Sequence, residues 1–138
     1  DHEAVVQHLM RVFGVIGSPA FRHELESMRP LFERVARRGL YRAGTSRQLL
    51  AILATGDRRP LLQGITAPTL VLHGADDPLV PLAAGIDTTA SIPGSRLEVV
   101  PGMGHDFPPG LMAHLARRIA EHCRAAERAA PAAGTPAA

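Results

Sequence analysis

The sequence predicts an α/β fold in which a helical segment precedes one parallel strand-helix-strand-helix unit. Residues 68–74 form a short, continuous apolar run between a proline and a glycine, which is typical of a parallel strand covered on both faces. Residues 96–100 form a second short run, and a helical pattern separates the two runs, as in a βαβ unit. Residues 1–57 show helical apolar spacing and no strand pattern.

The helical segment begins with a predicted helix over residues 3–16, whose apolar side chains recur at steps of three and four along one face. Residues 17–19, Gly-Ser-Pro, end this helix. Residues 21–36 repeat the spacing, but Pro30 removes a backbone donor. This stretch therefore forms either one kinked helix or two short helices.

A loop is expected over residues 38–45, which contain two glycines, and a third helix over residues 46–54. Further on, helices are predicted over residues 81–92 and 108–123, one on each side of the second strand. The final stretch is rich in alanine, proline and glycine, so we expect it to be a disordered tail. The predicted division is a helical cap segment with its exit helix (residues 1–57), a C-terminal α/β core segment (58–124) and a tail (125–138).

The predicted sheet is small for a chain of this length. Two parallel strands cannot bury both of their faces and edges, so we expect an incomplete domain that lacks an N-terminal half of the same fold. The chain has 138 residues and does not begin with methionine. Both observations fit the expectation of a truncated or processed piece.

Composition excludes several classes of function. All fifteen basic residues are arginine against thirteen acidic residues, and only 4% of residues are aromatic, so we expect no nucleic-acid partner. No stretch approaches the roughly 20 apolar residues of a membrane span, so no membrane partner is expected. The single cysteine, Cys123, cannot form an intramolecular disulfide, which favours a reducing, cytoplasmic location.

Two polar loops follow the two predicted strands directly. Residues 73–81 carry Asp76 and Asp77, and residues 101–106 carry His105. Because the carboxyl ends of parallel strands meet at one edge of a sheet, these side chains should lie close together. An aspartate that accepts a hydrogen bond from one ring nitrogen leaves the other nitrogen of the histidine free to act as a base.

Residues 68–81 and 92–105, the two strands with their loops, together resemble the C-terminal part of the α/β-hydrolase superfamily. In that family the catalytic acid follows the penultimate core strand and the catalytic histidine follows the last strand. The resemblance implies that Asp77 is the acid and His105 the base, with Asp76 as the fallback for the acid. It also implies a small hydrophobic ester-like substrate and no cofactor. The Pro-Gly-Met-Gly-His loop is similar, more weakly, to that of actinobacterial esterases related to aclacinomycin methyl esterases.

The nucleophile of that family has no counterpart in the chain. The family triad runs serine, acid, histidine, with the serine in a Gly-x-Ser-x-Gly elbow. None of the five serines lies in such an elbow: Ser18, Ser27, Ser46, Ser91 and Ser95. We therefore expect a carboxylic ester hydrolase whose serine lies upstream of Asp1, and an isolated chain that is inactive. Two alternatives are open: a non-catalytic or complementing fragment, and a parent with an aspartate nucleophile, as in dehalogenases and epoxide hydrolases.

The remaining polar residues near the two loops are expected to be structural. His73 should be packed or hydrogen-bonded at its strand end, and Asp106 should cap a helix or stabilise a loop. No His-Glu-x-x-His or paired-cysteine spacing is present, so no metal is expected. Apolar residues of the helical segment either pack between helices or line a substrate pocket, and three aromatic candidates for the pocket are Phe13, Phe32 and Tyr41.

Overall fold

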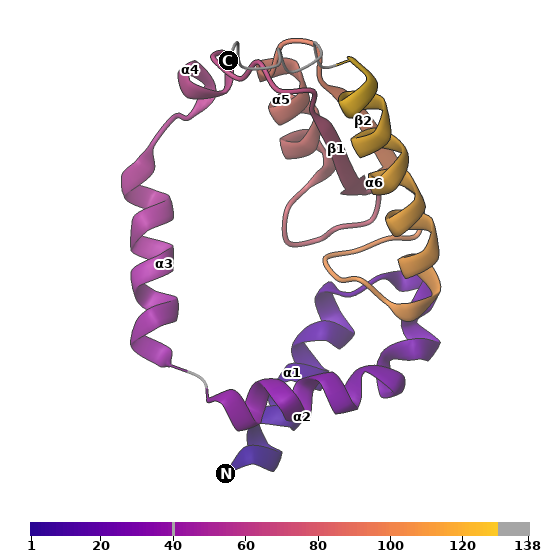
Figure 1. Ribbon diagram of the computed structural model, residues 1–138. Helices are drawn as coiled ribbons and strands as arrows, with labels where there is room; N and C mark the ends of the chain where they lie inside the picture. Colours follow the sequence, from indigo (N-terminus) through magenta and orange to yellow (C-terminus); the bar gives the residue numbers. More distant parts are fainter. Residues whose placement is uncertain (40, 130–138) are drawn as a thin grey trace, which may run out of the picture.

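The structure is a computed structural model that describes residues 1–39 and 41–129, without the side chain of residue 42. It contains helices followed by a strand-helix-strand-helix unit (Figure 1). The elements are α1 (His2–Ile16), η1, a 3₁₀ helix (Pro19–Met28), α2 (Arg29–Arg38), α3 (Arg42–Thr55), α4 (Arg59–Leu62), β1 (Leu70–Gly74), α5 (Leu82–Ser91), β2 (Arg96–Val100) and α6 (Pro109–Ala129).

β1 and β2 form a two-stranded parallel sheet that is paired in register from Leu70 with Arg96 to Gly74 with Val100. Side chains alternate between the two faces of a strand. On one face, Leu72 and Val100 pack with Leu111 and Leu115 of α6. α5 packs on the sheet as well, against the opposite face, where a Cβ atom built on Gly85 would lie only 2.7 Å from Nδ1 of His73. The sheet therefore has one helix on each face.

β1 is covered on both faces only in part, as expected for a sheet of two strands. The first four residues of β1 are half-buried, and of the strand only Gly74 is fully buried. A single helix spans only part of each face, and no third strand among the described residues covers either edge. The strand's apolar run therefore exceeds the cover that these residues provide.

The helices before the sheet build a separate apolar core. α1 and α2 pack against each other through Val6, Met10, Phe32 and Ala36, with Met28 from the end of η1. The ring centroids of Phe13 and Phe32 lie 5.0 Å apart, so these two aromatic residues belong to the packing between the helices.

The ambiguity at Pro30 resolves into two helices. Proline lacks a backbone donor but is tolerated in the first turn of a helix, where that donor has no partner. Pro30 lies in the first turn of α2, directly after the 3₁₀ helix η1.

Three predicted boundaries need correction. α3 begins at Arg42, inside the expected loop, and α4 was not predicted. The carboxylate of Asp57 accepts, at 3.0 Å, the backbone N–H of Arg59, which is the first residue of the short α4. α6 continues to Ala129 because alanine is the strongest helix former, so the first five residues of the expected tail are helical. Residues 130–138 lie outside the described residues.

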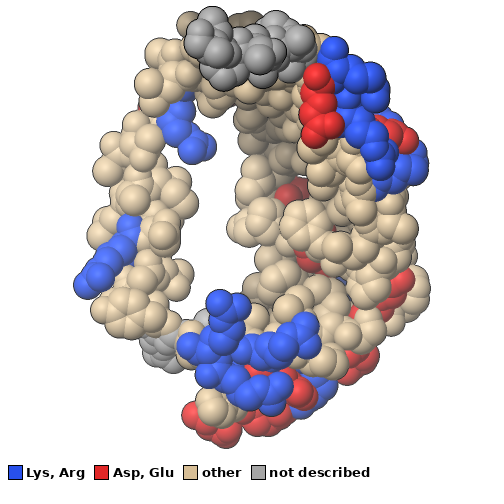
Figure 2. Space-filling model, in the orientation of Figure 1, with Lys and Arg blue, Asp and Glu red and all other residues tan. Residues whose placement is uncertain are grey.

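α3 stands apart from the other elements. It links α2 to α4, and Figure 2 shows an open space between it and the α/β unit. None of the described side chains of α3 is buried, and Leu50 and Leu53 are 64% and 70% exposed. Tyr41, just before α3, is 66% exposed and lies under the guanidinium of Arg47, 5.7 Å away.

The arginines over α2 lie on its solvated surface among acidic side chains (Figure 2). Arg29 contacts Glu3 and Glu33, and Arg37 contacts Glu33. Within the described ranges, no helix is both long and apolar enough to cross a bilayer.

Candidate active site

Asp77 lies in the turn after β1, and three hydrogen bonds fix its carboxylate. Its Oδ1 atom accepts the backbone N–H groups of Leu79 at 2.9 Å and Val80 at 2.8 Å. Its Oδ2 atom lies 2.8 Å from Nδ1 of His105. The side chain is only 7% exposed, so these donors replace water around the carboxylate. The local sequence Asp-Asp-Pro supplies the turn that folds the carboxylate back onto its own loop.

The pKa of Asp77 is lowered from its ordinary value by a balance of opposed effects. Burial is the largest effect and on its own raises the pKa, because it disfavours the charged form. The hydrogen bonds from Val80, His105 and Leu79, with the charge of His105, together outweigh burial. Asp77 is therefore an ionised hydrogen-bond acceptor at neutral pH.

His105 presents its two ring nitrogens to different surroundings. Because an ionised carboxylate can only accept, Nδ1 of His105 carries the proton in the bond to Asp77. Nε2 makes no hydrogen bond with any residue that the structure describes, and the side chain is 42% exposed. The arrangement leaves Nε2 as the acceptor that can take a proton from another group.

Asp76 is not the partner of the histidine ring. Its Oδ2 atom accepts the backbone N–H of Gly102 at 2.9 Å, and its own N–H donates to the carbonyl of Met103 at 3.0 Å. Asp76 therefore joins the acid loop to the backbone of the histidine loop, while Asp77 contacts the imidazole. The geometry supports Asp77 rather than Asp76 as the acid.

Asp106 fits the second of its two expected roles, stabilising a loop, but the sequence did not predict its partner. It does not cap α6. Its Oδ1 atom accepts both the backbone N–H of Ser18, at 2.8 Å, and the hydroxyl of Ser18. The two residues are 88 positions apart, and no spacing or composition signal links them.

His73 is structural in this geometry. Its Nε2 atom lies 2.9 Å from the carbonyl of Val80, and its ring packs on Gly85 of α5. Among residues 1–39 and 41–129 no group of three His, Cys, Asp or Glu side chains is placed to hold a metal ion.

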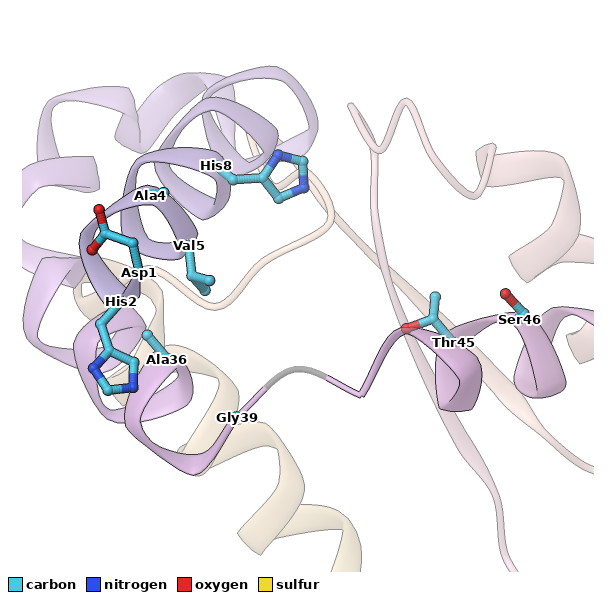
Figure 3. Close-up of a pocket in the computed structure, with 9 residues that line it drawn as sticks. All are labelled: Asp1, His2, Ala4, Val5, His8, Ala36, Gly39, Thr45 and Ser46. Atoms are coloured by element: carbon cyan, nitrogen blue, oxygen red, sulfur yellow. The ribbon is translucent and has the colours of Figure 1, made fainter.

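The acid and histidine open into a cavity of about 230 Å³. Its apolar lining includes Val80, Met103 and Phe107. A larger cavity of about 780 Å³ lies elsewhere, between α1, the end of α2 and the start of α3 (Figure 3). We place the candidate site in the smaller cavity, because its lining contains the hydrogen-bonded pair of Asp77 and His105, whereas no such pair is found among the described residues that line the larger cavity.

The predicted aromatic lining is not found at either cavity. Phe32 is 2% exposed and packs with Phe13 in the helical core. Tyr41 is exposed at the start of α3 and lines neither cavity. The structure therefore supports packing between helices, rather than pocket lining, as the role of Phe13 and Phe32.

Comparison with known proteins gives the family. Part of the chain is 42% identical over 45 residues to a non-heme haloperoxidase of Rhodococcus erythropolis. That alignment covers 32% of this chain and 16% of the length of the relative. The family model described as "alpha/beta hydrolase fold" matches residues 14–108, well over half of the chain, including both polar loops. The chain therefore belongs to the α/β-hydrolase fold family.

Proposed function

We propose that Asp77 and His105 are the acid and base of a carboxylic ester hydrolase with a Ser-Asp-His triad. The observation that carries the proposal is the 2.8 Å hydrogen bond from Nδ1 of His105 to a buried, ionised Asp77. This pair lies where the strands of an open α/β sheet end, which is the usual position of active sites in such folds. Membership of the hydrolase-fold family supports the same chemistry.

In the proposed reaction, Nε2 of His105 takes the proton of a serine hydroxyl as that oxygen bonds to the ester carbonyl carbon. The bond from that carbon to the leaving oxygen then breaks, and His105 returns the proton to the leaving alcohol. Water hydrolyses the acyl-enzyme by the same proton transfers. Asp77 holds the imidazole in the correct tautomer and stabilises its charged form.

The nucleophilic serine is proposed to lie outside these 138 residues, in the other part of the fold. Ser18 contacts the histidine loop, but its hydroxyl is engaged by Asp106 and by the N–H of Gly104. The apolar lining of the smaller cavity fits a small hydrophobic ester, for which no cofactor is needed. The weaker resemblance of the Pro-Gly-Met-Gly-His loop to actinobacterial esterases related to aclacinomycin methyl esterases is in keeping with an ester substrate.

The test is hydrolysis of an aryl ester by the chain together with the residues encoded upstream of Asp1. Removing the base or the negative charge of the acid should lower kcat by about 10⁴ in His105→Ala and Asp77→Asn. Asp87→Asn, on the exposed surface of α5, is the matched control and should keep full activity. Unimpaired turnover by His105→Ala would overturn the proposal.

A second candidate follows from the haloperoxidase relative. Its name points to peroxide-dependent halide chemistry, and the similarity covers 45 residues. Halogenation of a phenolic dye in the presence of peroxide and bromide, without ester turnover, would favour this candidate.

If the extended chain shows neither activity and does not react with a serine-directed probe, the chain is a non-catalytic fragment. Labelling of an aspartate by an alkyl halide would instead favour a dehalogenase-type parent.

A further inference from the structure

Three consecutive residues of the histidine loop are attached to the junction between α1 and η1. The N–H of Gly104 donates to Oγ of Ser18 at 2.9 Å, and the N–H of His105 donates to the carbonyl of Ile16 at 2.8 Å. The carboxylate of Asp106 accepts the N–H and the hydroxyl of Ser18. The backbone on both sides of the imidazole is therefore held by residues 16–18.

The Ser18 hydroxyl is fully used in this junction. Ser18 is 3% exposed, and its Oγ atom accepts one hydrogen bond from Gly104 and donates one to Asp106. A charged acceptor that receives two donors is a stronger partner than a neutral one. Removing either side chain leaves buried polar groups without a partner, which is more costly than the bond itself.

The two backbones approach so closely that only glycine fits between them. A Cβ atom on Gly104 would lie 2.5 Å from the carbonyl oxygen of Gly17 and 2.7 Å from that of Ile16. A Cβ atom on Gly17 would lie 2.7 Å from Oδ2 of Asp106. This close approach makes the position of the junction a direct determinant of the position of His105.

The acid loop holds the same loop from the other side, but at a different place. Asp76 contacts Gly102 and Met103, which precede the histidine. Ser18 contacts Gly104 and Asp106, which are the residues on either side of the histidine. The acid loop therefore fixes the start of the histidine loop, and the junction fixes the residue that carries the imidazole.

We propose that Ser18 and Asp106 are a positioning pair, which holds the His105 backbone so that its Nδ1–H group meets Asp77. This inference rests on the proposed function in one respect, the role of His105 as the base. Neither residue donates to or accepts from the imidazole, so both act through the loop. The pair links the helical segment before the sheet to the candidate base.

The test uses the 138-residue chain with ¹⁵N-labelled histidine and backbone. It is studied by NMR at a pH high enough for the histidine side chains to be neutral. In the wild type, His105 should show the single tautomer with its proton on Nδ1. Asp106→Ala should lose that single tautomer and give a mixture, and the amides of Gly104 and His105 should exchange about tenfold faster, as expected for loss of one charge-assisted hydrogen bond. Asp106→Asn keeps an acceptor oxygen and should retain the wild-type tautomer.

The controls separate positioning from a general loss of structure. Asp87→Ala, an exposed carboxylate on α5, should change nothing, and the His73 signals should stay constant in every folded variant. A folded Asp106→Ala chain with the wild-type His105 tautomer would overturn the inference. If Asp106→Ala does not fold, hydrogen exchange of the wild-type amides is the test. Protection of the Gly104 and His105 amides supports the positioning pair. Exchange as fast as that of exposed loop amides overturns it.

The measurement needs neither substrate nor nucleophile, so its outcome is independent of the ester assay. An intact tautomer response with no ester turnover would overturn the proposed function alone. Ester turnover with no tautomer response would overturn the positioning pair alone.

Discussion

The helices α1 and α2 differ from the helix α3 both in how their apolar residues are arranged and in their surroundings: α1 and α2 gather these residues on one face, whereas α3 spreads them around its circumference. In the first region Val6 and Phe32 are each 2% exposed, and the two helices pack face to face. In α3, Leu50 and Leu53 are more than half exposed, and none of its described side chains is buried. Helices with a one-sided apolar face thus pack together, whereas α3, which has no such face, finds no partner among the described residues.

The candidate site and α3 also differ in how firmly neighbouring elements hold them. The histidine loop is held by the first region through Ile16 and Ser18, and by the acid loop through Asp76. α3 links α2 to α4 and is separated from the α/β unit by the opening seen in Figure 2.

The largest expected effect is in the helical core. Phe32→Ala deletes a ring that is 2% exposed and packs with Phe13, so it should lower the free energy of unfolding by about 3–5 kcal/mol. The measurement is urea denaturation of the isolated chain, followed by far-UV circular dichroism.

Leu50→Ala is the matched control for this prediction. Leu50 is 64% exposed, so its change should stay within about 0.5 kcal/mol. Equal losses of unfolding free energy in Phe32→Ala and Leu50→Ala would contradict the difference between the two regions, because α3 would then be packed in solution.

A smaller effect is expected where the helical region meets the histidine loop. Gly104→Ala places a methyl group 2.5 Å from a backbone oxygen of Gly17, which cannot move aside as a side chain can. The expected loss is about 1–3 kcal/mol in the free energy of unfolding, with displacement of the His105 signals in the NMR spectrum.

Gly64→Ala is the control for the close approach. A Cβ atom there would meet the nearest atom, the carbonyl oxygen of Leu61, at 3.5 Å, an ordinary contact. A Gly104→Ala variant as stable as Gly64→Ala would show that the two backbones lie further apart in solution.

The smallest effect concerns Asp77 and depends on pH. Because folding lowers the pKa of Asp77, its stabilisation is fully present above the pKa of the unfolded chain, roughly 3.9, and is lost as the pH falls through the lower folded value. Asp77→Asn should therefore reduce stability by about 1–2 kcal/mol at pH 7, and the difference from wild type should shrink below about pH 4. Urea midpoints at a series of pH values measure this, and a difference that stays constant down to pH 3 would contradict it.

Much of this site could be predicted, because its residues follow strands directly. Asp77 and His105 come after two short apolar runs, and parallel strands bring their carboxyl ends to one edge. The contact between Asp106 and Ser18 could not be predicted, since it joins residues 88 positions apart that belong to different elements. The resemblance favoured Asp77 over Asp76 as the acid, whereas spacing alone could not separate them, because adjacent residues share the same loop and differ only in direction.

By itself, the sequence determined the order of the elements and the pairing of an acid loop with a histidine loop. These depend on local periodicity, on proline and glycine, and on the alternation of strand and helix. Only the tertiary structure decided which helices find partners and how residues 16–18 hold the loop that carries His105. The reason is physical: burial and long-range hydrogen bonds depend on which surfaces meet in space, and that information is spread over the whole chain.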